Sequence, residues 1–243
     1  MEKILEVKGL TKLYKNKRGI RDITFDIYKG DVFGFLGPNG AGKTTAMKAI
    51  ASLCRADSGE IKVQGYDCMD EYEKAMEGVG CIIENPAAFE YMSGYKNLEM
   101  VSRYYEGIDG SRIDEVLETV GLKEFKDEKV SGYSLGMKQR LGLAAAILSN
   151  PELVILDEPL NGLDIEGMVE MRKLIKTLSE EKRITFFISS HLIHEVELTC
   201  NRIGIIQNGR LLETGLVSDM KKESDSLEEY YLNKIKEVRG YAQ

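Results

Sequence analysis

Residues 37–44, GPNGAGKT, have the composition and spacing of a phosphate-binding loop. Glycines let the backbone curl so that successive N–H groups point toward a phosphate, and a helix that follows adds its positive N-terminal end. We expect Lys43 to bridge the β- and γ-phosphates of a nucleotide and the Thr44 hydroxyl to bind Mg²⁺. An ordinary glycine-rich turn is the alternative, and the strand-like DVFGFL before the loop disfavours it. The residues predicted to bind the nucleotide here are Gly37, Pro38, Asn39, Gly40, Ala41, Gly42, Lys43, Thr44 and Thr45.

A second chemical signal is LVILDE, residues 153–158, in which four apolar residues precede two acids. A buried strand of this kind would carry both carboxylates to its carboxyl end, beside the phosphate loop. We expect Asp157 to hold Mg²⁺ through its water shell and Glu158 to polarise an attacking water. An acidic turn is the alternative interpretation, and the phosphate loop upstream favours the functional one.

These residues require an α/β framework to position them. Strand-like segments separated by glycines and helical stretches predict alternating strands and helices. The expected strands are residues 4–10, 20–27, 31–37, 60–65, 79–84, 153–158, 184–190 and 202–215, with a helix at 43–53.

Between about residues 87 and 150 the strand pattern stops, and helices are expected at 97–107, 111–121 and 134–148. Ser111 is placed to cap the second of these helices and Gly121 to end it. Its apolar stripe, Ile113, Val116, Leu117 and Val120, is expected to be core. The predicted units are therefore residues 1–86 and 151–217 for the nucleotide-binding core, 87–150 for a helical insert and 218–243 for a helical tail.

Composition limits the remaining possibilities. The chain has 243 residues, 33 Lys and Arg against 40 Asp and Glu, and a net charge of −7, so bulk charge does not favour nucleic acid. Apolar runs such as residues 141–148 are too short to span a bilayer, which predicts a soluble, cytosolic chain. Four cysteines lack metal-ligand spacing and are expected to be buried free thiols.

With six motifs in family order, the sequence resembles the ATP-binding subunit of ABC transporters over nearly its whole length. The resemblance implies the ABC ATPase fold: an α/β P-loop NTPase core, an N-terminal antiparallel β subdomain and an inserted all-helical signature subdomain. Tyr14 looks like the aromatic residue that stacks on adenine, although packing is an alternative role. His191, after the ITFFI strand, resembles the catalytic switch histidine. A metal pair with His194 is the alternative, and no third ligand is evident.

Residues 133–140, YSLGMKQR, resemble the family's signature LSGGQ, with Ser134 and Gly136 in the expected places and Leu135 and Met137 replacing a glycine and the glutamine. Asp164, in NGLD, resembles the D-loop aspartate. The resemblance implies that Ser134, Gly136 and Asp164 complete the phosphate site of a partner chain. ATP would then join two copies, or this chain and a related one, head to tail.

Glu84, in GCIIENP, stands where most of the family has a glutamine that contacts Mg²⁺. The predicted metal set is therefore Thr44, Glu84 and Asp157, and the carboxylate could slow or retune hydrolysis. Together with SLGMKQR, this segment resembles the bacitracin- and lantibiotic-type exporters. That implies a Mg²⁺-dependent ATPase, peripheral on the inner face of the cell membrane, which powers a separate permease.

Three other functions are alternatives. A soluble ABC-type ATPase that acts on nucleic acid or ribosomes would have tandem cassettes, coiled insertions or basic surfaces, and none is present. A GTPase or small-molecule kinase would leave SLGMKQR unexplained, and the guanine-reading NKxD is absent. A catalytically weak regulatory subunit is favoured by Glu84 and the altered signature, and disfavoured by the intact Lys43, Asp157 and Glu158.

Overall fold

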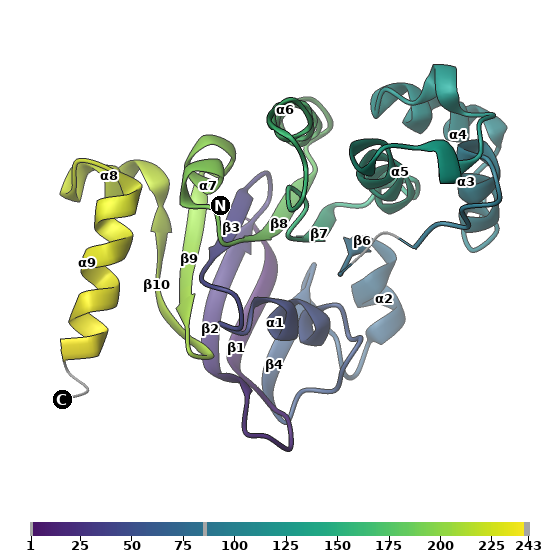
Figure 1. Ribbon diagram of the computed structural model, residues 1–243. Helices are drawn as coiled ribbons and strands as arrows, with labels where there is room; N and C mark the ends of the chain where they lie inside the picture. The colour runs from purple at the N-terminus through teal and green to yellow at the C-terminus, as the bar shows by residue number, and fades with distance from the viewer. Residues whose placement is uncertain (1, 85–86, 241–243) are drawn as a thin grey trace.

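The computed structural model describes residues 2–84 and 87–240 and contains two β-sheets with helices around them (Figure 1). The larger sheet has six strands in the order β10-β9-β3-β8-β7-β6. All neighbouring strands in it are parallel except β9 and β10. Its strands are β3 (Val32–Leu36), β6 (Val79–Ile82), β7 (Leu153–Asp157), β8 (Thr185–Ser190), β9 (Arg202–Gln207) and β10 (Arg210–Leu216).

The central strands of this sheet are buried on both faces, which explains their unbroken apolar sequences. In β3, Val32 and Leu36 join one hydrophobic core, and Phe33 and Phe35 join the other. Because side chains alternate along a strand, β3 contributes apolar side chains to the hydrophobic cores on both faces of the sheet. The strands near the phosphate loop are therefore fixed from two sides.

The smaller sheet is antiparallel, in the order β2-β1-β4-β5. Helix α1 (Lys43–Ile50) packs against strands of both sheets, and Phe25 of β2 stacks on Phe33 and Phe35 of β3 at ring-centroid distances of 5.4 and 5.5 Å. These contacts join the antiparallel sheet to the face of the larger sheet that carries α1. The strands of the smaller sheet are β1 (Lys3–Leu13), β2 (Gly19–Tyr28), β4 (Ser58–Val63) and β5 (Tyr66–Asp67).

The opposite face of the larger sheet is covered by helices α6 (Ile165–Lys182) and α7 (Ile193–Thr199). Between β6 and β7 the chain forms α3 (Gly94–Ser102), α4 (Gly110–Thr119) and α5 (Leu135–Ile147), which lie to one side of the sheet in Figure 1. Two short 3₁₀ helices, η1 (Lys123–Phe125) and η2 (Val130–Gly132), connect α4 to α5, and α2 (Tyr72–Glu77) precedes β6.

The details of α4 test two sequence predictions. The stripe Ile113, Val116, Leu117 and Val120 is buried, as expected of core residues. The cap prediction was wrong, because Asp109 rather than Ser111 caps the helix and accepts hydrogen bonds from the backbone N–H groups of Ser111 and Arg112. An aspartate two residues upstream therefore lengthens the first turn.

At the C-terminal end, α8 (Val217–Glu223) and α9 (Leu227–Gly240) follow β10, and α9 lies beside β10 at the edge of the molecule in Figure 1. Lys234 of α9 forms an ion pair with Glu213 of β10 at 2.8 Å, which ties this end of the chain to the sheet. Within residues 2–84 and 87–240, no helix combines the length and the apolar character that crossing a membrane requires.

Candidate active site

Most of the candidate catalytic and nucleotide-binding residues lie at one edge of the larger sheet. The phosphate loop follows β3, Asp157 ends β7, His191 follows β8, and Glu84 comes two residues after β6. Because these four strands are parallel, their carboxyl ends meet at the same edge. The topology therefore brings together segments that are more than 100 residues apart in the sequence.

The phosphate loop has the backbone that its glycines permit. Gly40 and Gly42 have φ values of 79° and 108°, in the left-handed region that other residues seldom adopt. A Cβ atom on Gly37 would lie 2.3 Å from the carbonyl oxygen of Ile206, so a larger residue does not fit there. Helix α1 begins at Lys43 without a side-chain cap on its N-terminus. Its first N–H groups and its positive dipole end are therefore available to a phosphate.

Lys43 is buried beneath this loop, with 5% of its side chain exposed. Its ammonium donates to the carbonyl oxygens of Gly37 at 2.8 Å and Pro38 at 3.3 Å, and lies 3.0 Å from Oε1 of Glu158. The loop and the Glu158 carboxylate thus share one cation.

Glu158 stands just beyond β7 in a strained backbone conformation, with φ of 50°. Its second carboxylate oxygen lies 2.9 Å from Nδ1 of His191, and its backbone N–H donates to Oγ of Ser189 at 2.9 Å. The predicted catalytic residues Lys43, Glu158 and His191 therefore form one connected set. A general base needs partners of this kind to fix its orientation.

Asp157 is buried and joined to two hydroxyl groups. The Thr44 hydroxyl donates to its Oδ2 at 2.8 Å, and the Ser189 hydroxyl donates to its Oδ1 at 2.5 Å. Ser189 was missed by sequence reasoning, although it stands in the ITFFISS strand beside His191. Hydroxyl and carboxylate oxygens are the ligands that Mg²⁺ prefers, so the donor set fits this ion once water and phosphate oxygens complete it.

Glu84, the third predicted metal ligand, is held elsewhere. Its carboxylate lies 2.5 Å from Nζ of Lys48 on α1, and this hydrogen bond raises the pKa of the Lys48 ammonium. Within residues 2–84 and 87–240, no three His, Cys, Asp or Glu side chains gather as a metal site. The structure brings Thr44 and Asp157 together without Glu84, and the same finding leaves a His191–His194 metal pair without a third ligand.

The residues assigned to adenine and to a partner's phosphate lie outside this set. Tyr14, one residue after β1, has 44% of its surface exposed and is open to a flat ligand. Ser134 caps α5, with its Oγ accepting from the Met137 N–H at 3.2 Å, and Asp164 caps α6. In the described parts of the chain, the hydrogen bonds of Ser134 and Asp164 do not reach the phosphate loop.

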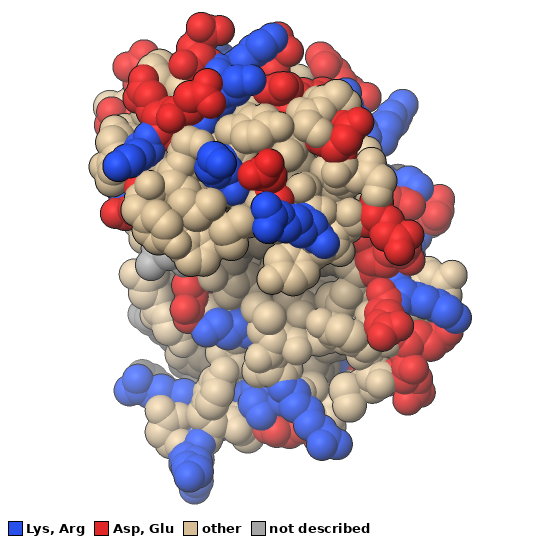
Figure 2. Space-filling model, turned by 90° about the vertical axis from the view of Figure 1, so that its right-hand side faces the viewer, with Lys and Arg blue, Asp and Glu red and all other residues tan. Residues whose placement is uncertain are grey.

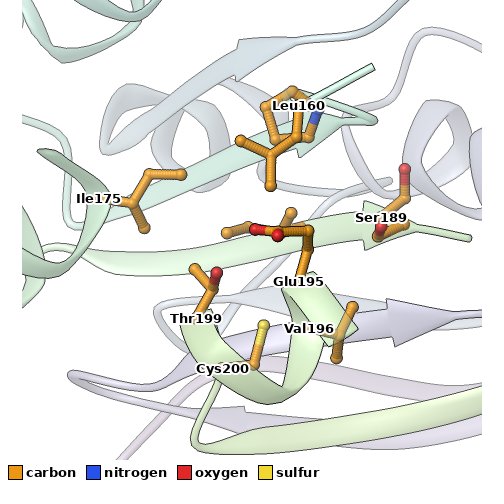
Figure 3. Close-up of a pocket in the computed structure, with 10 residues that line it drawn as sticks. Leu160, Ile175, Ser189, Glu195, Val196, Thr199 and Cys200 are labelled. Atoms are coloured by element: carbon orange, nitrogen blue, oxygen red, sulfur yellow. The ribbon is translucent and has the colours of Figure 1, made fainter. Parts of the chain in front are cut away.

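A small internal pocket behind β8 is not a rival site. Figure 3 shows Glu195, Thr199 and Cys200 extending from α7 toward the strand that carries Ser189. The cavity measures about 10 Å³, which is room for one water at most. Complete burial raises the pKa of the Cys200 thiol to about 12, so it is a neutral packing group.

The prediction of four buried thiols was only half right, because Cys200 and Cys68 are buried whereas Cys54 is half-buried and Cys81 is exposed. Cys81 lies on β6, the last strand of the sheet, where one side has no neighbouring strand to cover it. A periodicity read along one strand does not reveal which strand is at the edge.

Comparison with known proteins is consistent with this geometry. The ABC transporter family profile matches residues 20–161, more than half of the chain. The bacitracin transport ATP-binding protein BcrA of Enterococcus faecalis is 40% identical over 95% of this chain and 75% of its own length. The lantibiotic transport ATP-binding protein SrtF of Streptococcus pyogenes is 37% identical over 96% of this chain and 97% of its own length.

Among solved structures, an ATP-binding subunit of an ABC transporter superposes with a TM-score of 0.83 at 28% identity, covering 96% of this chain and 99% of the other. The predicted fold class is thereby confirmed, with its P-loop core, antiparallel sheet and helical insert. The matched residues include the phosphate loop, Glu84, the signature segment and both acids after β7. The chain therefore belongs to the ATP-binding subunits of ABC transporters, a family of ATPases.

Proposed function

We propose that this chain hydrolyses Mg²⁺-bound ATP to drive a separate permease that exports membrane-active peptide antibiotics. The observation that carries the catalytic part is the connected set of Lys43, Glu158 and His191, with Thr44 and Asp157 beside it. Lys43 would neutralise the β- and γ-phosphates, Glu158 would orient and deprotonate the attacking water, and His191 would hydrogen-bond the γ-phosphate.

Thr44 and Asp157 are the residues proposed to hold Mg²⁺. When bound, the ion would neutralise charge that develops on the phosphate oxygens. Ser189 supports this role, because its hydroxyl bonds the Asp157 carboxylate and accepts from the Glu158 backbone. One serine thus fixes the orientation of both acids.

A second copy, or a related ATPase subunit, is proposed to complete the site with its signature segment and with Asp164. The surface near these residues supports the proposal, since Leu135 and Ile165 are 47% and 78% exposed. The two segments also come close together, because a Cβ atom built on Gly162 would lie 3.1 Å from Cδ2 of Leu135. An exposed apolar surface of this kind is typical of a protein interface.

The permease is proposed to dock on the side of the molecule that carries the helical insert and faces the viewer in Figure 2, where largely uncharged surface is hollowed near its middle. A groove of about 220 Å³ lies on the insert, between residues 87–89 and helices α3 and α5. Phe89 and Tyr104 at its edge are 47% and 87% exposed. Docking there would place the chain at the cytoplasmic face of the membrane.

The cargo proposal rests on the two relatives named for bacitracin and lantibiotic transport. Removing the chain from its native cell should lower the inhibitory concentration of bacitracin or of a lantibiotic. The inhibitory concentration of an antibiotic that acts on ribosomes should not change. An equal change for both antibiotic classes, or none for either, would contradict the cargo proposal and leave the ATPase chemistry untouched.

The catalytic proposal is tested by Mg²⁺-dependent ATP turnover of the purified protein beside Glu158→Gln. Light scattering with and without ATP would report the oligomeric state. The variant should lose about 10²- to 10⁴-fold in turnover and accumulate as an ATP-bound dimer. Glu152→Gln is a matched control, because Glu152 pairs with Lys29 at 2.6 Å on an exposed surface. Wild-type protein that neither turns over nor dimerises would favour a regulatory subunit.

A further inference from the structure

The pairing of Glu84 with Lys48 is the starting point. Glu84 follows β6 in the left-handed conformation, with φ of 70°, and its carboxylate lies 2.5 Å from the Lys48 ammonium. The exposed fractions of the two side chains are 63% and 30%, so the pair lies at the surface. A non-glycine residue in this conformation is strained, and a specific contact is needed to hold it.

Lys48 lies on the phosphate-binding helix itself. It stands four residues after Thr44 on α1, so both side chains share one face of the helix, about 6 Å apart along its axis. The Thr44 hydroxyl bonds Asp157 at 2.8 Å. Lys48 therefore holds the Glu84 carboxylate roughly one helical turn from the pair that would bind Mg²⁺.

The other end of this connection is fixed to the helical insert. The backbone N–H of Phe89 donates to Oδ1 of Asn97 at 2.7 Å, and Glu90 pairs with Lys138 of the signature helix α5 at 2.5 Å. Glu84 is thus tied to the phosphate-binding helix, and Phe89 and Glu90 are tied to the insert. The Glu84–Lys48 pair therefore affects how the phosphate-binding helix and the insert are connected.

We propose that Lys48 is a positioning residue, which holds the Glu84 carboxylate on α1 and must release it before Glu84 can reach a nucleotide-bound Mg²⁺. The inference rests on the proposed function. A partly exposed ion pair biases an equilibrium by about fivefold at most, so a divalent cation can compete with it. Lys48 also offsets the negative charge that Glu84 adds near the triphosphate.

The test measures Mg²⁺ binding through energy transfer. The chain has no tryptophan, so Phe89→Trp introduces a single donor at the end of the segment. A fluorescent ATP analogue carrying a methylanthraniloyl group is the acceptor, and Mg²⁺ is titrated at fixed nucleotide. Lys48→Met should lower the half-saturating Mg²⁺ concentration about twofold to fivefold, because Glu84 no longer has to leave a partner.

The second half of the test is a double-mutant cycle. In a Glu84→Gln background, Lys48→Met should produce a much smaller decrease, since the uncharged amide can accept a hydrogen bond from the ammonium but forms no ion pair with it. Lys48→Arg should keep the wild-type Mg²⁺ dependence. Lys74→Met, which breaks the exposed pair with Glu71 at 2.9 Å on α2, controls for removal of one positive charge. Thermal unfolding of each variant would confirm that it folds.

The possible outcomes distinguish failure of this inference from failure of the proposed function. A shift that depends on Glu84 supports the positioning role. An equal shift in the Glu84 and Glu84→Gln backgrounds, or none in either, overturns it while the ATPase proposal stands. Failure of every variant, and of the reporter protein itself, to bind the analogue would overturn the proposed function, and this inference would fall with it.

Discussion

Two regions of the molecule differ in how many of their polar groups have partners within the same chain. One is the phosphate-loop edge, the sheet edge with Lys43, Asp157, Glu158 and His191. The other is the signature face, the surface with Ser134, Leu135, Asp164 and Ile165. At the edge, Lys43 is 5% exposed, and Lys43, Asp157, Glu158 and His191 are linked by contacts of 2.5–3.0 Å through neighbouring side chains. On the signature face, Ser134 bonds only the backbone of its own helix among the described residues. Apolar Ile165, next to Asp164, is 78% exposed.

This difference indicates which half of the chemistry each region performs. Groups at the edge are already held close to one another by contacts within the chain, which is the preorganisation that the proposed phosphate chemistry requires. Groups on the signature face include a hydroxyl that donates to no other group in the described residues, the N-terminal N–H groups of a helix and exposed apolar surface, all of which a second molecule could contact. This is the arrangement expected if, as proposed, the chain completes the site of a partner.

The largest effect is expected from Lys43→Met, which breaks the assembled region. Without the ammonium, the Glu158 carboxylate loses a partner at 3.0 Å and the loop loses its internal donor. ATP turnover should fall about 10²- to 10³-fold or more, with weaker binding of a fluorescent ATP analogue. Lys74→Met should retain wild-type values, and similar turnover in the two variants would contradict the assigned role of Lys43.

Ser134→Ala tests the complementary region and has a matched control in Asp109→Ala. Each residue caps a helix of the insert, so each variant should lose about 1 kcal/mol in its free energy of unfolding by chemical denaturation. Only Ser134→Ala should also lower ATP turnover, by about 10- to 100-fold, since its hydroxyl is proposed to contact the partner's γ-phosphate. Equal ATP turnover in the two variants would mean that Ser134 acts only as a helix cap.

Ser189→Ala is expected to have a smaller effect, on the internal support of the edge. Its loss leaves the Glu158 N–H and one oxygen of Asp157 without their hydroxyl partner, which costs about 1–3 kcal/mol in unfolding free energy. Turnover should fall about tenfold, because a supporting residue orients the acids without touching the nucleotide. Ser190→Ala is the control, since Ser190 is buried and, in the described structure, its hydroxyl accepts only from the Leu192 N–H, at 3.0 Å. A larger loss of turnover in the control would reverse this assignment.

The edge was the more predictable region from sequence, for a physical reason. The phosphate loop and the two acids are each encoded by a few consecutive residues: glycines that permit one backbone, and apolar strands that end in polar side chains. Parallel pairing then brings Lys43 beside Glu158 without further information. Local sequence and one topological rule were therefore sufficient for the positions of Lys43, Asp157 and Glu158.

What sequence reasoning missed depends on neighbours from distant segments. Ser189 is an ordinary strand serine until β7 places Asp157 beside it, and the pairing of Glu84 with Lys48 joins residues 36 positions apart. The exposure of Cys81 follows from β6 being the edge strand. None of these features has a periodicity or a spacing that a single sequence displays.

Ile165→Lys should have the smallest effect on the stability of the isolated chain. It therefore tests the signature face without disturbing the phosphate-loop edge. Because the side chain is 78% exposed, the free energy of unfolding should change by no more than about 0.5 kcal/mol. Burying an apolar side chain of this size at an interface is worth about 1.5–3 kcal/mol, so the ATP-dependent dimer of the Glu158→Gln protein should weaken at least about tenfold by light scattering. Leu232→Lys, on α9 and 47% exposed, should leave dimerisation unchanged. If both substitutions weaken the dimer equally, added charge is responsible; if neither does, the surface around Asp164 lies outside the contact between chains.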